Sequence, residues 1–270
     1  MSDIVLTAGV RSNLLQLQKT ADLITATQTK LATGKRVNSA LDNPVNFFTA
    51  QALSNRASDL SNLLDSMASG ISTIQAANNG ITSITKLVES AQALISQANQ
   101  TSDTTVRASL ATQFGSIRTQ IDKLAGDAGF NGINLLNGNN LTLTLNETGT
   151  STVTVTSVTF TSTGLGVNAA ANNWGATADI AAASTNLTAA LTALRTQAQS
   201  FGSNLSTVQI RQDFTKAMIN TLQTGADALT LADSNEEGAN LLALQTRQQL
   251  STTALSLASQ ASQAVLRLFQ

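Results

Sequence analysis

The sequence predicts a mainly α-helical fold, in which long antiparallel coiled-coil helices from both termini form a rod with a small central β-hairpin region. Apolar residues recur at alternating spacings of three and four over long stretches at both ends of the chain. Aromatic residues make up only 3% of the 270 residues, so a core built on large rings is not expected. Only the segment between residues 126 and 179 departs from the helical period.

The first predicted helix carries an apolar seam that Gln28 interrupts. Gly34 can end this helix, because glycine readily adopts the left-handed conformation that follows a helix. Pro44 suits the first turn of the next helix. The seam residues of the first helix are Val10, Leu14, Leu17, Ala21, Ile24 and Leu31.

The second predicted helix spans about residues 45–99, which corresponds to roughly 80 Å at the helical rise of 1.5 Å per residue. Gly70 and Gly80 would each weaken it by about 1 kcal/mol relative to alanine, so neighbouring segments must hold it. A third helix is expected over residues 104–125, with Asp103 as its N-cap. The second helix has its seam at Leu60, Leu64, Met67, Ile71, Ile74, Asn78, Ile81, Ile84, Val88, Ala91 and Ile95.

Two runs of alternating β-branched or apolar residues, 141–145 and 153–156, predict strands, and the turn residues 146–151 lie between them. We therefore expect β-hairpins within about residues 137–178. The helical period then resumes from Leu187 to Leu229. A last seam runs almost to the final residue, through Leu250, Ala254, Leu257, Ala261, Ala264 and Leu268.

Seams that reach both termini cannot all be buried in one compact globule, whose diameter would be about 40 Å. The terminal helices must therefore pack on each other, on other copies or on a partner. This predicts a terminal coiled-coil domain made of residues 1–40 and 234–270, and a rod domain over residues 41–233.

Composition excludes several functional classes. The chain has no His and no Cys, which rules out thiol chemistry, disulfides and the common zinc sites. Its net charge of -1 argues against nucleic-acid binding, which requires a basic surface. No segment approaches the ~20 consecutive apolar residues of a membrane span. The N-terminal residues lack a basic segment followed by an apolar one, so no signal peptide of that kind is expected.

Motifs that could carry chemistry are incomplete. Gly34-Lys35 lacks the other residues of a phosphate-binding loop. Residues 233–238 resemble the start of a calcium loop, but Leu244 stands where the bidentate carboxylate is required. A helix N-terminus capped by Ser234 or Asn235 explains this run better. We expect no enzyme activity, no cofactor and no metal.

Three segments resemble bacterial flagellins. Residues 31–42 (LATGKRVNSALD) are similar to the family's LSSGxRINSAxD segment, residues 130–136 (FNGINLL) to its FNGxxLL segment, and residues 244–266 to its final helix. The chain departs from the family at Asn43-Pro44 and Phe47-Phe48, where small residues are usual. The motif residues that carry the resemblance are Gly34, Arg36, Asn38, Ser39, Asp42, Phe130, Asn131 and Gly132.

The resemblance implies a structural subunit that polymerises into the helical flagellar filament used for swimming motility, in a minimal form without the large outer domains. It implies that the paired terminal helices line the filament. It also implies an extracellular location, reached without a cleaved signal peptide. The implied partners are other copies of the chain and sister flagellins, the flagellar type III export apparatus and its chaperone, and the filament cap and hook-junction proteins.

A hook-filament junction protein is the alternative, because it would share the terminal helices but occur in few copies. Self-polymerisation into long tubes separates the two. A cytosolic coiled-coil adaptor and an enzyme are more distant alternatives.

Overall fold

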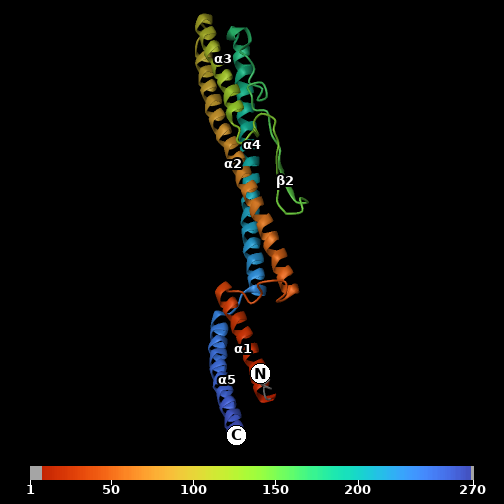
Figure 1. Ribbon diagram of the computed structural model, residues 1–270. Coiled ribbons are helices and arrows are strands. Elements are labelled where there is room, and N and C mark those ends of the chain that lie inside the picture. Colours follow the sequence, from red (N-terminus) through yellow and green to blue (C-terminus); the bar gives the residue numbers. More distant parts are fainter. Residues whose placement is uncertain (1–7, 269–270) are drawn as a thin grey trace. The chain divides into compact units, whose positions relative to one another are not determined.

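The computed structural model describes residues 8–268 and is mainly α-helical, which confirms the predicted fold class (Figure 1). Its two strands form one antiparallel sheet. The chain divides into two compact units, residues 1–55 with 221–270 and residues 56–220. The elements are α1 (Ala8–Thr33), α2 (Pro44–Gln100), α3 (Thr104–Asp127), β1 (Leu141–Thr144), β2 (Thr152–Val155), the short 3-10 helix η1 (Ala171–Trp174), α4 (Thr177–Thr230) and α5 (Ser234–Leu268).

A glycine and two carboxylates mark three of the helix ends. Gly34 follows α1 with a φ of +66°, as the sequence predicts. The Asp103 side chain accepts hydrogen bonds from the amides of the first turn of α3, which confirms the predicted cap. The predicted cap of α5 is wrong, because Asp233 rather than Ser234 or Asn235 accepts the amide hydrogen bonds there. A carboxylate one residue earlier reaches the same amides and also suits the positive helix end.

The core of the unit formed by residues 56–220 lies between α2, α3 and α4, with the hairpin and the loops after it packed against them. Every residue of the predicted α2 seam is buried or half-buried, so this seam faces the core. The largest fully buried side chains include Met67, Ile74, Ile84, Phe114, Ile121, Trp174, Ile180, Leu187, Leu194 and Phe201.

The two glycines inside α2 lie where other segments approach the helix most closely. A Cβ on Gly80 would lie 2.7 Å from the Cβ of Ala128 and from a methyl group of Leu136. A Cβ on Gly70 would lie 2.5 Å from a methyl group of Leu143. Each glycine lowers the helix propensity of α2 locally, but its lack of a side chain lets the neighbouring segments pack closely against the helix. These segments hold α2, as expected from its sequence.

The β-hairpin covers α2 with one face. Leu141 pairs with Val155 and Leu143 with Val153, and Leu141, Leu143 and Val155 are buried. Within the hairpin turn, Glu147 forms an ion pair with Arg56 of α2. Its own backbone amide and then Arg56 lower the pKa of the Glu147 carboxyl, against an opposing effect of desolvation.

Within the described residues, the region 137–178 holds one two-stranded hairpin. The chain after β2 is held against α3 by side chains. Asp122 accepts a hydrogen bond from the Ser162 amide at 2.7 Å, and Arg118 donates to the Val167 carbonyl at 2.7 Å. These bonds satisfy backbone groups that a second hairpin would otherwise pair.

A strained turn leads into α4. Asn172, Asn173 and Trp174 all have positive φ values, between +46° and +59°. This backbone places the Trp174 side chain, which is fully buried, against Phe114 with 5.1 Å between the ring centroids. Burial of the two rings offsets the cost of the left-handed backbone.

In the described part of the chain, no helix has both the length and the apolar character needed to cross a membrane.

Candidate functional site

The terminal helices α1 and α5 pack against each other within the unit formed by residues 1–55 and 221–270 (Figure 1). The buried and half-buried positions of α1 include a continuous heptad pattern, which marks the face turned toward α5. These positions are Val10, Asn13, Leu17, Thr20, Ile24, Thr27 and Leu31.

Two threonines are the most buried residues of α1, since Thr20 is 0% and Thr27 6% exposed. The Thr20 hydroxyl donates to the Gln16 carbonyl at 2.8 Å, so its methyl group can pack while its polar group stays satisfied. The predicted seam shares Val10, Leu17, Ile24 and Leu31 with this face. Of its other members, Leu14 is 41% exposed, and Ala21 is half-buried but lies outside this heptad pattern.

Two different faces of α5 carry apolar residues. The face toward α1 is half-buried and follows the heptad positions Glu237, Leu241, Leu244, Gln248, Ser251, Leu255 and Ala258. The predicted seam lies on another face, here called the outer stripe, and its members Leu250, Ala254, Leu257, Ala261 and Ala264 are all exposed. The Leu268 side chain lies outside the described part. The structure therefore does not bring the outer stripe to α1.

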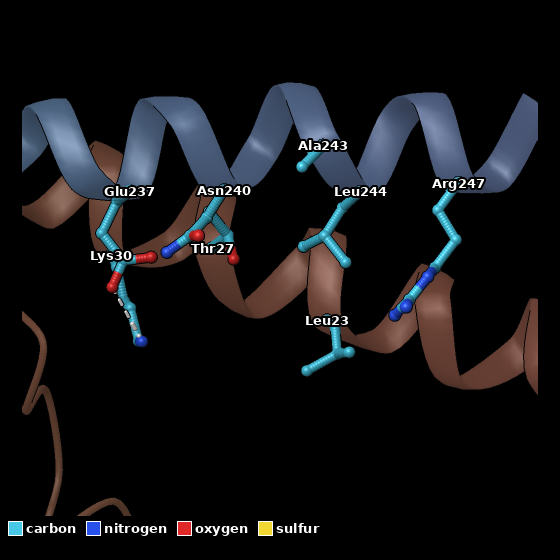
Figure 2. A pocket seen from close by; sticks show the side chains of 8 residues that line it. All are labelled: Leu23, Thr27, Lys30, Glu237, Asn240, Ala243, Leu244 and Arg247. Atoms are coloured by element: carbon cyan, nitrogen blue, oxygen red, sulfur yellow. Dashed lines mark hydrogen bonds and ion pairs between the residues drawn. The ribbon is translucent and has the colours of Figure 1, made fainter.

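A groove of about 520 Å³ runs between α1 and α5 (Figure 2). At one end Lys30 of α1 donates to Glu237 of α5 at 2.9 Å. Because the Lys30 side chain is 36% exposed, this ion pair contributes at most about 1 kcal/mol and mainly sets the helix register. The groove is lined by Leu23, Thr27, Lys30, Glu237, Asn240, Ala243, Leu244 and Arg247.

The first flagellin-like motif, residues 31–42, forms hydrogen bonds with the end of α4 and the segment that connects α4 to α5. Arg36 donates from its amide to the Thr230 carbonyl at 2.8 Å and from its guanidinium to the Ala228 carbonyl at 3.0 Å. The Ala232 amide donates to the Gly34 carbonyl at 3.0 Å. The segment after α1 is thereby fastened to the end of α4, which fixes where α1 and α5 begin to pair.

Asp42 closes the loop between α1 and α2. Its Oδ2 accepts hydrogen bonds from the amides of Asn38 and Ser39, both at 2.9 Å, and from the Ser39 hydroxyl at 3.2 Å. The Asn38 side chain in turn donates to the Lys35 carbonyl. The amide of Ser39, followed by that of Asn38, lowers the pKa of the Asp42 carboxyl, because both bonds favour its charged form.

This loop should open in acid. A lowered folded-state pKa means that Asp42 stabilises the loop fully above its ordinary pKa of about 4, and that this stabilisation is lost as the pH falls through the lowered value. The Ser39 amide resonance, followed by NMR during acid titration, should report a midpoint below the ordinary value. Asp42→Asn should abolish this transition, and a midpoint at the ordinary value would contradict the assignment.

The second motif forms a tight turn in the unit of residues 56–220. Phe130 and Ile133 exchange two backbone hydrogen bonds, of 2.9 and 3.0 Å, across Asn131 and Gly132, whose φ values are +49° and +80°. Asn134 follows, is 8% exposed and donates to the Ala125 and Gly126 carbonyls at the end of α3. The motif therefore turns the chain back onto the helices.

Among the described residues, no cluster of three or more His, Cys, Asp or Glu side chains could hold a metal ion.

Sequence reasoning missed Thr20 and Thr27 because their polar character hides their place in the seam. A heptad count that admits threonine would have found them.

Comparisons with known proteins agree with these motifs. A model of the bacterial flagellin N-terminal helical region matches residues 7–141, and one of the C-terminal helical region matches residues 184–269. Flagellin FljK of Caulobacter vibrioides is 34% identical, with 100% of this chain and 99% of that protein covered. A flagellin of Brucella melitensis is 27% identical, with 100% of both covered. The crystal structure of Bacillus cereus flagellin is similar over 56% of this chain and 88% of that one, with a TM-score of 0.49 and 21% identity.

Proposed function

The chain belongs to the bacterial flagellin family, and we propose that its terminal helices supply the contacts through which its copies polymerise. It is a structural subunit of the flagellar filament and not an enzyme, and it assembles with copies of itself outside the cell. The hook-junction alternative is not favoured, because both family models and the full-length relatives are flagellins.

One observation carries the proposal about the terminal helices: the outer stripe of α5 is apolar and uncovered. Leu250 and Leu257 are 67% and 62% exposed. A soluble helix that keeps a heptad of apolar residues in water is stabilised by covering that face. We assign the cover to neighbouring copies, so that residues 1–40 and 234–270 form the domain that lines the filament and residues 41–233 form the rod domain.

The contact between α1 and α5 buries too little apolar surface to stabilise the two helices without further burial at the outer stripe. Most of its seam is only half-buried, whereas a fully buried Leu contributes about 1.5–3 kcal/mol. Ordering each backbone residue costs about 1–2 kcal/mol. Contacts with neighbouring copies would add the missing burial, and they would couple the stability of α1 and α5 to assembly.

Further partners are proposed from the family to which the chain belongs. We propose export through the flagellar type III apparatus without a cleaved signal peptide, with an export chaperone covering the α5 surface before assembly. Filament cap and hook-junction proteins would contact the two ends of the polymer, and sister flagellins could share its lattice.

Seeded growth tests the proposed function. Purified chain added to short filament fragments should extend them into long tubes, visible by electron microscopy and recovered by sedimentation. A filament subunit adds indefinitely, because each added copy offers the same surface again. A chain that stays in the supernatant, or that only caps the fragments, would contradict the proposal.

A further inference from the structure

Among the described residues, five large apolar side chains outside α1 and α5 are more than half exposed, and they form two groups. Leu41, in the loop before α2, and Val45 and Phe48, in the first turns of α2, are 96%, 74% and 63% exposed in the unit that carries the terminal helices. Ile210 and Phe214 are 66% and 55% exposed on α4, in the unit of residues 56–220. We call these the α2 patch and the α4 patch.

Each patch occupies one side of its element. Val45 and Phe48 are three residues apart and Ile210 and Phe214 four apart, which places each pair on one helix face. Phe48 is further held by an edge contact with Phe47, at 5.5 Å between ring centroids. Both patches lie outside α5, so neither is part of the outer stripe.

The two patches carry complementary charges. Asp42 lies beside Leu41 and is exposed, and its Oδ1 accepts no hydrogen bond among the described residues. Lys30 of the same chain acts on its charge without forming an ion pair. Arg211 lies beside Ile210, is exposed, and has no ion-pair partner within the described part, whereas Asp213 beside Phe214 pairs with Lys216 at 3.5 Å. A carboxylate at the rim of one apolar patch and a guanidinium at the rim of the other favour contact between them.

We propose that the α2 patch of one copy packs on the α4 patch of a neighbouring copy in the filament, with Asp42 facing Arg211. The proposal rests on the polymerisation described above. A contact between two different surfaces is heterologous, so each copy keeps one free patch of each kind and the contact can repeat along a polymer. The α2 patch is also continuous with the unit whose helices mediate assembly.

Cysteine cross-linking tests this contact cleanly, because the chain has no native cysteine. Chains carrying Val45→Cys and chains carrying Ile210→Cys would be copolymerised on seeds, sedimented and treated with a short bismaleimide. Mixed filaments should give covalent dimers, and filaments of either variant alone should not. Ser54→Cys, exposed on α2 and turned away from Val45 by roughly 180°, is the control and should lose the dimer.

Mixing two single variants shows that any dimer joins different copies. Absence of dimers in sedimented mixed filaments whose thiols still react with a monofunctional maleimide would overturn the proposal. Failure to sediment would concern polymerisation itself.

A second measurement needs no substitution. Hydroxyl-radical footprinting of the unaltered chain should show Phe48 and Phe214 losing reactivity together when monomers become filaments. If either side chain in sedimented filaments reacts as fast as in the monomer, the contact does not exist.

Discussion

Leu257→Asp should abolish filament formation while leaving the free chain folded. Leu257 is 62% exposed on the outer stripe, so the new carboxylate remains in water in the monomer. In a filament whose neighbouring copies cover the stripe, the same carboxylate would be buried without a partner, which costs about 3–5 kcal/mol. Repeated at every copy, this cost prevents growth. Seeded sedimentation should find the variant in the supernatant, with an unchanged far-UV circular dichroism spectrum.

Two neighbouring substitutions provide the controls. Ser256→Asp adds the same charge one residue earlier, about 100° away on a polar face of α5, and should still polymerise. Leu255→Asp places it on the half-buried face toward α1 and should disturb the pairing of α1 with α5 in the free chain as well. Normal filaments from Leu257→Asp would show that the outer stripe stays in water.

Phe114→Ala should destabilise the unit of residues 56–220 by about 3–5 kcal/mol, the usual loss when a buried Phe is truncated and leaves a cavity. Phe114 is 1% exposed and contacts Trp174. Trp174 is the only tryptophan and the chain has no tyrosine, so its fluorescence reports on this core without interference. Urea unfolding followed at this residue should show the lower midpoint.

Phe214→Ala serves as the comparison in the same unit. Its side chain is 55% exposed, so its loss should change the free energy of unfolding by less than about 1 kcal/mol. Equal effects of the two substitutions would mean that α2, α3 and α4 do not pack around Phe114 as described.

Periodicity was sufficient to predict α2, α3 and the two strands, whereas α4 begins at Thr177, ten residues before Leu187, where the helical period was predicted to resume. The α2 seam, the Asp103 cap and the strands at 141–145 and 153–156 depend on local spacing, and the structure has them within one or two residues. The roles of Gly70 and Gly80 could not be predicted, because they depend on which distant segment lies against α2. How the chain after β2 is held could not be predicted for a similar reason, since Asp122 and Arg118 bind its backbone from α3.

The candidate site was only partly accessible from the sequence. Counting apolar residues finds Leu17, Ile24 and the outer stripe, but it gives no information on which of two apolar faces of α5 meets α1. The choice depends on side chains such as Thr20 and Thr27, whose hydroxyls make them look like solvent-facing residues. The function, by contrast, was predicted from the resemblance of three segments, residues 31–42, 130–136 and 244–266, to bacterial flagellins.

Hydrogen exchange at the amides of α1 and α5 tests the central claim, that neighbouring copies stabilise the terminal helices. In the free chain these amides should exchange far faster than those of the α2 core, because the helices share only a half-buried seam. In sedimented filaments they should become as protected as the core. Equally strong protection of the Leu257 amide in the free chain and in filaments would contradict the account and indicate a self-contained helical pair.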